Sequence, residues 1–172
     1  MTMSKIGLVL EGGGMKCAYT AGILDAMMDN SVTFDYCIGV SAGSANGVSF
    51  IAGQRGRNIR FYTEHINEKG YFGLSSFLKT GNLFGLQYIY GTLTNSGGAD
   101  PLDFDAFMKS PMEYWLVATD AQTGKPTYFS KKDMHKDDYR HVMASCAIPA
   151  VCRPVEIDGR FYYDGGVSDS IP

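Results

Sequence analysis

Short apolar runs alternate with helix-compatible segments along the first fifty residues. Residues 5–10 form an apolar run without helical periodicity, bounded by glycines, which predicts a buried parallel strand. Residues 17–29 predict a helix, because small side chains gather on one face while Asp25 and Asp29 lie on another. A second strand over residues 36–40 leads into a helix over residues 42–52. This order of strand, loop, helix, strand and helix predicts an α/β protein.

The pattern weakens after Gly53 and returns at Met112. Residues 58–66 and 101–109 are compatible with short helices. Residues 114–119 and 126–130 predict two strands joined by a turn, and residues 137–144 predict a helix. Residues 151–157 and 160–163 flank Asp158-Gly159, a strong hairpin signal. Since no repeat, linker or low-complexity segment interrupts the chain, residues 1–172 are predicted to form a single domain.

Two segments of the weaker region leave alternatives open. Residues 70–93 are rich in aromatic and aliphatic side chains broken by glycines, so they could line an acyl-chain pocket or form helices that cover the sheet. If they line a pocket, Phe72, Phe77 and Phe84 are the expected contacts. Arg55, Arg57 and Arg60 form either a solvated face or a contact with lipid phosphate at a membrane surface.

Composition excludes several classes of protein. The 172 residues are 45% hydrophobic and 19% charged, which is typical of a globular domain, and they contain no apolar run long enough for a membrane span. The net charge of −3 includes no basic excess that could neutralise the phosphates of a nucleic acid. The first apolar run is too short for a signal peptide. The cysteines contain no CxxC pair, which predicts reduced, buried thiols in a cytoplasmic protein at Cys17, Cys37, Cys146 and Cys152.

The sequence Gly39-Val40-Ser41-Ala42-Gly43 joins the second predicted strand to its helix. A serine at so sharp a turn adopts a strained backbone that exposes its hydroxyl, and the flanking glycines let the strand and helix approach each other. The helix N-terminus also favours negative charge at this point. Ser41 is therefore the predicted nucleophile, although a GxSxG sequence can occur by chance in a chain with 21 glycines.

The loop after the first predicted strand contains Gly12, Gly13 and Gly14. Glycine amides can point inward to hold an oxyanion, and loops at the carboxyl ends of parallel strands open on the same edge of the sheet. Nucleotide binding by this loop is the competing hypothesis. Lys16 comes too soon after Gly14 for a Walker loop, and Cys17 occupies the position of the third glycine in a dinucleotide-binding fingerprint.

Two kinds of base could activate Ser41. A Ser-His-Asp triad would require His65, His135 or His141, none of which lies at a predicted strand end. Asp164 closes the last predicted strand and precedes Gly165 and Gly166. A partly desolvated carboxylate there could accept the hydroxyl proton directly. The alternative is that Asp164 only makes an Asx turn.

The glycine loop with Lys16, the Ser41 motif and Asp164-Gly165-Gly166, in this order, resemble the patatin-like phospholipases. Residues 144–149 also resemble the family pattern, so the resemblance covers nearly the whole chain. It implies a three-layer α/β/α sandwich with a mainly parallel sheet and a Ser41-Asp164 catalytic dyad. It further implies an oxyanion site with Lys16 beside the glycines, a lipid acyl ester or phospholipid substrate, and no metal or cofactor.

Two features depart from the family pattern. Cys17 replaces a glycine at the end of the first motif. The chain ends at Pro172, shortly after Asp164, whereas family members continue with further helices and a strand, so a truncated catalytic domain is expected. The predicted function is lipid acyl hydrolysis, with peripheral membrane contact as an open alternative to a purely soluble enzyme. A catalytically silent acyl-lipid binding domain and a nucleotide-binding domain remain the other hypotheses, and the sequence predicts no oligomeric state.

Overall fold

The computed structural model describes residues 5–73, 77–78 and 80–172. Within this part, the strands form one mixed sheet of six strands in the order β1-β2-β3-β6-β5, with β4 paired to β3. The parallel strands β1, β2 and β3 span Gly7–Leu10, Tyr36–Val40 and Glu113–Asp120. The antiparallel strands β4, β5 and β6 span Pro126–Ser130, Val155–Ile157 and Arg160–Asp164. The predicted α/β class is confirmed.

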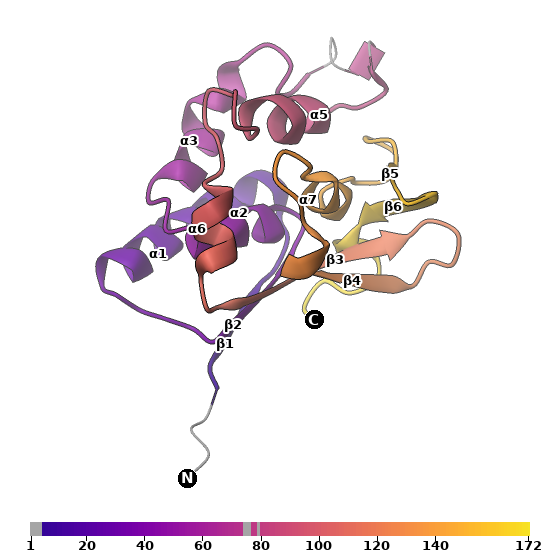
Figure 1. The fold of residues 1–172 in the computed structure, drawn as a ribbon. Coiled ribbons are helices and arrows are strands. Elements are labelled where there is room, and N and C mark those ends of the chain that lie inside the picture. The colour runs from indigo at the N-terminus through magenta and orange to yellow at the C-terminus, as the bar shows by residue number, and fades with distance from the viewer. Residues whose placement is uncertain (1–4, 74–76, 79) are drawn as a thin grey trace.

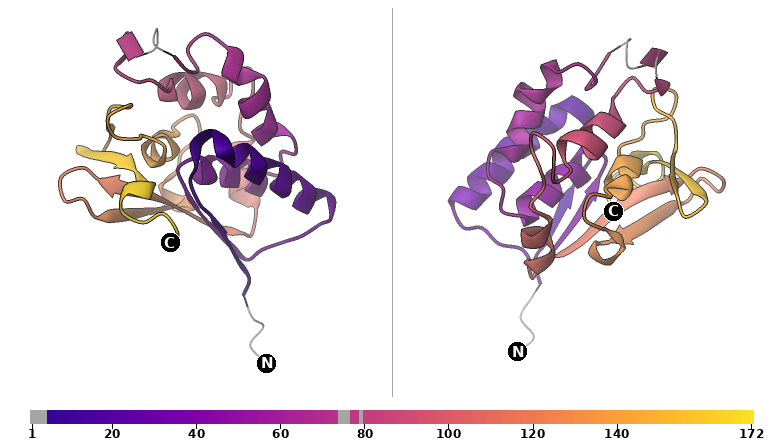
Figure 2. Two further views of the ribbon diagram at one scale, coloured as in Figure 1. Left: turned by 180° about the vertical axis from the view of Figure 1, so that it is seen from behind. Right: turned by 45° about the horizontal axis from the view of Figure 1, so that its top comes forward.

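The described helices lie mainly on one side of this sheet (Figures 1 and 2). Helices α2 (Ala42–Ile51) and α7 (Arg140–Ser145) pack directly on the strands, whereas α1 (Ala18–Asp29) and α3 (Arg57–Thr63) pack on α2 and on each other. Helix α6 (Phe104–Lys109) also contacts α2. The remaining helical segments are short: η1 (Gly14–Cys17), η2 (His65–Asn67), α5 (Leu86–Tyr88), the π-helical turn η3 (Ile89–Leu93), η4 (Lys131–Asp133) and η5 (Gly165–Val167).

The main core lies between the sheet and α2, as the alternation of side chains along the strands requires. Leu10, Cys37 and Leu116 point from three adjacent strands toward Val48 and Ile51 on α2, and all five are buried. On the opposite face, Ile38, Val40 and Val117 form a smaller cluster.

The C-terminal turn η5 lies against this opposite face. The hydroxyl of Ser168, just after η5, lies 2.8 Å from that of Thr119 on β3, and Tyr128 on β4 donates a hydrogen bond to Asp169. Within the described residues, η5 and the residues just after it therefore pack on the face of the sheet opposite to the helices. Val9 on β1 and Phe161 on β6 are 44% and 49% exposed. The first strand, which the sequence predicts to be buried, is instead an edge strand with one open face.

Most predicted elements occur within a few residues of their expected places. The strand pair over 114–119 and 126–130 matches β3 and β4, and the hairpin at Asp158-Gly159 joins β5 to β6. Asp25 differs from expectation: it is buried, because its carboxylate accepts a hydrogen bond from the backbone N–H of Gly56. All four cysteines are free and buried, as predicted.

Candidate active site

Ser41 forms the sharp turn between β2 and α2 that the glycine pattern predicts. Its backbone has φ 53° and ψ −131°, a strained conformation for a residue other than glycine. A Cβ atom on Gly39 would lie 2.5 Å from the Cα of Ser44, and one on Gly43 would lie 2.3 Å from the carbonyl oxygen of Leu10. Only glycine at both positions allows β1, β2 and α2 to approach this closely.

Asp164, at the end of β6, lies directly beside the Ser41 side chain. The Ser41 hydroxyl donates a hydrogen bond of 2.6 Å to Oδ2 of Asp164, and the N–H of Gly166 donates one of 2.8 Å to Oδ1. Burial raises the pKa of Asp164, although these two hydrogen bonds act in the opposite direction. The carboxylate therefore accepts from the serine while its proton affinity is increased, which are the two properties of a general base.

The main chain on both sides of the Ser41–Asp164 pair is fixed by buried groups. The carbonyl oxygen of Ser41 accepts from the N–H of Ser44 at 2.9 Å and from its hydroxyl at 2.6 Å. The carbonyl oxygen of Asp164 accepts from the hydroxyl of Thr119 at 2.8 Å. A Cβ atom on Gly165 would lie 2.2 Å from the carbonyl oxygen of Val117, so this glycine lets the chain after Asp164 lie against β3.

The glycine loop contacts Ser41 from the end of β1. A Cβ atom on Gly12 would lie 2.8 Å from the Cβ of Ser41, and Gly14 adopts φ 53°. The N–H of Lys16 closes the loop by donating to the carbonyl oxygen of Gly13 at 3.1 Å. Within residues 5–73, 77–78 and 80–172, no backbone hydrogen bond engages the N–H groups of Gly12 and Gly13. These donors are therefore free to bind an anion next to the Ser41 hydroxyl.

Lys16 and Cys17 contribute to this loop in different ways. Lys16 has an exposed side chain, so its contribution to the loop is the backbone hydrogen bond to Gly13. The thiol of Cys17 is buried, lies 3.7 Å from the carbonyl oxygen of Glu11, and would contact a Cβ atom on Gly13. Cys17 therefore fills space beneath the loop and leaves the three glycines in place.

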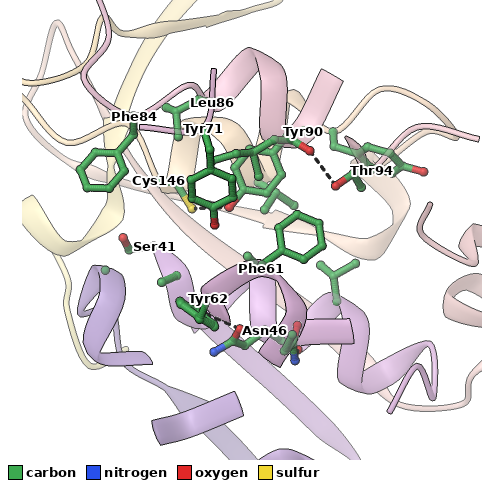
Figure 3. A pocket seen from close by; sticks show the side chains of 18 of the residues that line it. Ser41, Asn46, Phe61, Tyr62, Tyr71, Phe84, Leu86, Tyr90, Thr94 and Cys146 are labelled. Carbon is green, nitrogen blue, oxygen red and sulfur yellow. Dashed lines mark hydrogen bonds between the residues drawn. The ribbon is translucent and has the colours of Figure 1, made fainter. Parts of the chain in front are cut away.

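Ser41 opens onto an apolar pocket that encloses about 870 Å³, its open mouth included. Figure 3 shows the pocket running from Ser41 past Tyr71 and Phe61 toward Thr94. Helices α2 and α3 form one wall, and α5 with η3 forms the other. Most of the lining is aliphatic or aromatic, as in pockets that bind small organic ligands, and its polar members include Asn46, Arg57, Asn58 and Thr94.

The wall formed by α5 and η3 belongs to the aromatic segment over residues 70–93. Phe84 lines the pocket as expected, and so do other residues of the segment, namely Tyr71, Leu86, Ile89 and Tyr90. Phe72 and Phe77 do not line it: they are 50% and 39% exposed, and Phe72 packs against the outer side of Phe84 with ring centroids 5.0 Å apart. The expectation for residues 74–76 and 79 lies outside the described residues.

A buried charge network closes the far end of the pocket. Arg57 is 5% exposed, lines the pocket, and donates to the hydroxyl of Thr94 and the carbonyl oxygen of Asp100. The Asp100 carboxylate lies 3.4 Å from Nε of Arg57 and accepts two hydrogen bonds from Arg60. Burial lowers the pKa of Arg57 to about 10, which leaves it charged at neutral pH.

This network corrects both interpretations of the arginine trio. Arg57 is buried and the Arg60 side chain is 38% exposed, and both pair with Asp100, so they join α3 to the chain around Asp100. Arg55 does lie on the surface, where it pairs with Asp29 of α1 at 2.6 Å. The spacing of the three arginines does not reveal their partners. Asp100 follows Arg60 by 40 residues and Arg57 by 43.

The histidines all lie in other surroundings. His65 is buried, with Nδ1 2.6 Å from Glu68 and Nε2 3.1 Å from Asp100, so it belongs to the charge network. His141 is buried on α7, where its ring packs edge-on against Phe129. His135 is exposed. Among the described residues, no histidine is a hydrogen-bond partner of Ser41 or Asp164.

Two kinds of feature are absent from the described residues. They contain no group of three or more histidine, cysteine, aspartate or glutamate side chains arranged to hold a metal ion. No helix among them is both long and apolar enough to span a bilayer.

Sequence reasoning missed some of the residues that surround the pair. Ser145 on α7 accepts a hydrogen bond from the backbone of Ser41, and Tyr90 lies with its hydroxyl 3.3 Å from the Cys146 thiol inside the pocket. Ser145 lies within the family-like pattern over residues 144–149, but that pattern alone does not assign it a role. Nothing in the sequence distinguishes Tyr90 from the other aromatic residues of its segment.

The sequence of this chain is similar to those of several known proteins. Residues 8–172 match the family model described as "Patatin-like phospholipase". An uncharacterized protein of Escherichia coli, YjjU, is 32% identical over 98% of this chain and 47% of its own length. "Lysophospholipase NTE1" of Yarrowia lipolytica is 28% identical over 97% of this chain and 11% of its own length. Thus the chain spans about half or less of these relatives.

A solved structure supports the fold. VipD from Legionella pneumophila superposes with a TM-score of 0.63 at 14% identity, over 98% of this chain and 47% of VipD. At this identity the likeness concerns the fold alone. The family model, in contrast, covers nearly the entire sequence, from β1 through the Ser41 turn to the Asp164 strand end. The chain therefore belongs to the patatin-like phospholipase family.

Proposed function

We propose that this chain is a serine lipid acyl hydrolase of the phospholipase A or esterase type, with Ser41 as nucleophile and Asp164 as general base. One observation carries the proposal: the Ser41 hydroxyl donates a 2.6 Å hydrogen bond to Asp164 at the mouth of an apolar pocket. The pair supplies a nucleophile with a base within reach, and the pocket supplies room for an acyl chain.

In the first half of the reaction, Ser41 Oγ attacks the acyl carbonyl carbon while its proton passes to Oδ2 of Asp164. The carbonyl oxygen becomes an oxyanion, which the free N–H groups of Gly12 and Gly13 stabilise, with the N-terminus of α2 adding favourable field. The ester C–O bond then breaks, and the leaving alkoxide takes the proton from Asp164. An acyl group remains on Ser41.

In the second half, Asp164 takes a proton from a water molecule that attacks this acyl-enzyme. The same donors hold the second oxyanion, and Ser41 recovers its proton from Asp164 as the fatty acid leaves. No step calls for a metal or cofactor. The alcohol leaves more readily than an amine would, which suits esters better than peptides to a base without histidine.

The pocket supports a lipid acyl ester or phospholipid as substrate. Its apolar walls begin at Ser41, so an acyl chain bound there would place its ester carbonyl at the serine. The relative from Yarrowia lipolytica is named a lysophospholipase, which agrees with such a substrate. Exposed Phe77 and exposed Phe72, which packs against pocket-lining Phe84, suit peripheral contact with a lipid surface.

Labelling with a fluorophosphonate tests the proposal directly. The reagent should add one phosphonyl group to wild-type protein at Ser41, and the Ser41→Ala variant should stay unlabelled. Hydrolysis of a lysophospholipid and of a nitrophenyl ester should be lost in the same variant. A wild-type protein that binds a fluorescent fatty acid but resists both labelling and turnover would instead be the catalytically silent lipid-binding domain.

A further inference from the structure

The backbone N–H of Ser41 is held by a side chain that lies 104 residues away in sequence. It donates a buried 2.9 Å hydrogen bond to Oγ of Ser145, the last residue of α7. Ser145 is fully buried and does not line the pocket, so its hydroxyl is directed at the main chain of the serine and not at a ligand.

The same short segment also holds Asp164. Two residues after Ser145, the carbonyl oxygen of Ala147 accepts a 2.9 Å hydrogen bond from the backbone N–H of Asp164. Residues 145–147 therefore bind the main chain of both members of the pair, the serine through a side chain and the aspartate through a backbone carbonyl. The distance between the two depends on this segment.

The strained turn makes the Ser41 N–H sensitive to its partner. A residue with φ 53° reverts to a relaxed conformation unless its surroundings fix it on both sides. Ser44 fixes the carbonyl side of Ser41 through two hydrogen bonds, whereas the Ser145 hydroxyl is the partner on the amide side. Loss of that oxygen would leave a buried N–H unpaired and free the preceding peptide plane to rotate.

We propose that Ser145 is a positioning residue for the reaction: its hydroxyl oxygen fixes the Ser41 main chain so that Ser41 Oγ stays in hydrogen-bond contact with Asp164. The inference rests on the proposed function, in which Ser41 is the nucleophile. Ser145 acts through Ser41 and touches neither substrate nor proton. Its removal should therefore slow the chemical step and leave substrate affinity unchanged.

The variants Ser145→Thr and Ser145→Val form a matched pair. Their side chains have nearly the same shape, so both impose the same strain on this fully buried position, but only threonine retains an oxygen that can accept from Ser41. Ser145→Ala is a third variant that removes the oxygen without adding bulk. Fluorophosphonate labelling of Ser41, steady-state kinetics and thermal unfolding would be measured for each.

The valine variant should label and turn over roughly tenfold to a hundredfold more slowly than the threonine variant, which corresponds to about 1.4 to 2.7 kcal/mol. KM should stay equal within the pair, and the alanine variant should show a similar loss in kcat relative to wild type. The pH midpoint of labelling should rise in the valine variant, because Asp164 then loses the Ser41 hydrogen bond, which lowers the pKa of its carboxyl.

Two results would contradict the inference, one by excluding the positioning role of Ser145 and the other by excluding the proposed function itself. If the wild-type protein reacts at Ser41 and the threonine, valine and alanine variants react equally fast, Ser145 does not position the serine. If the wild-type protein itself does not react at Ser41, the proposed function fails and the inference fails with it.

Discussion

Gly12 lies so close to Ser41 that a Cβ atom on the glycine would stand 2.8 Å from the Cβ of the serine. The glycine loop and Ser41 are therefore packed against each other. We expect Gly12→Ala to displace both and to lower kcat by about a hundredfold or more, the scale of losing one oxyanion donor, with little change in KM. Steady-state kinetics on a soluble ester would measure both constants.

Gly22→Ala is the control for this prediction. Gly22 lies on α1, and a Cβ atom there would meet nothing within 4 Å, so kcat should be unchanged. A Gly12→Ala variant that raised KM while keeping kcat would show that the loop binds substrate and does not stabilise the transition state.

Asp164→Asn should abolish most turnover, because the amide can still accept the Ser41 hydrogen bond but cannot take its proton. The expected loss in kcat is about a hundredfold to ten-thousandfold. Exposed His135 offers the control, since His135→Gln should keep full activity. Replacing all three histidines at once would be a poor test, because buried His65 and His141 support the fold. Wild-type turnover in Asp164→Asn would exclude the dyad.

The same substitution should act on stability in the opposite direction. Because burial raises the pKa of Asp164, the ionised carboxylate is disfavoured in the folded state at pH values above that pKa. Asp164→Asn removes this charge, so its thermal midpoint at neutral pH should exceed that of the wild type. The difference should shrink as the pH falls and the wild-type carboxyl becomes protonated. A lower midpoint at neutral pH would contradict this account.

The pH profile of kcat/KM should show an acid limb set by Asp164. The base works only when ionised, so activity should fall tenfold per pH unit below its pKa, with a midpoint above the ordinary value of 3.8. The midpoint should be identical in His135→Gln and His141→Gln. A midpoint that shifts in either variant would show that a histidine, and not Asp164, controls the acid limb.

Val48→Phe should shorten the acyl pocket without touching the reacting atoms. Val48 lies on the pocket wall six residues along α2 from Ala42, which is about 9 Å farther from the mouth at 1.5 Å per residue. Long-chain esters should lose most of their kcat/KM, while short-chain esters should keep theirs. Val32→Ser, at an exposed position that does not line the pocket, is the control that leaves the pocket length unchanged. Equal losses for both chain lengths would argue against an acyl chain in this pocket.

Asp100→Asn should destabilise the fold, because it leaves buried Arg57 without its counter-charge. Removing one partner of a buried ion pair costs about 3 to 5 kcal/mol of unfolding free energy. Denaturant unfolding would measure it, with Asp29→Asn as the control at the exposed pair with Arg55, where little change is expected. Comparable effects of the two substitutions would mean that the Arg57 charge is not buried in solution.

Local sequence patterns predicted the sharp turn at Ser41 and the strand end at Asp164, because these features depend on neighbouring residues. Gly39 marks the turn at Ser41 because a side chain there would collide with Ser44 within the turn itself. The Asp158-Gly159 turn likewise places Asp164 at a strand end. In such cases the cause of the structure lies within a few residues, and a pattern can reveal it.

The missed features depend on contacts between distant parts of the chain. Arg57 seemed a surface residue because its partner Asp100 follows 43 residues later, and Ser145 lies 104 residues from the backbone it supports. Phe72 and Phe84 belong to one aromatic segment, yet one is half exposed and the other faces the pocket. Composition alone could not separate them, since both are phenylalanines of the same aromatic segment.

The apolar pocket beside Ser41 shares its walls with the hydrophobic core, since Val48, Leu102 and Val142 belong to both. A fatty acyl chain in the pocket would therefore complete the packing of the domain as well as present an ester to Ser41. The ligand-free protein would be the less stable form. A bound fatty acid would raise the unfolding temperature, and at concentrations above Kd this increase would grow with the logarithm of the fatty acid concentration. A fatty acid retained in the pocket would inhibit turnover and also stabilise the folded protein. Purified samples with the highest unfolding temperature should therefore show the slowest turnover.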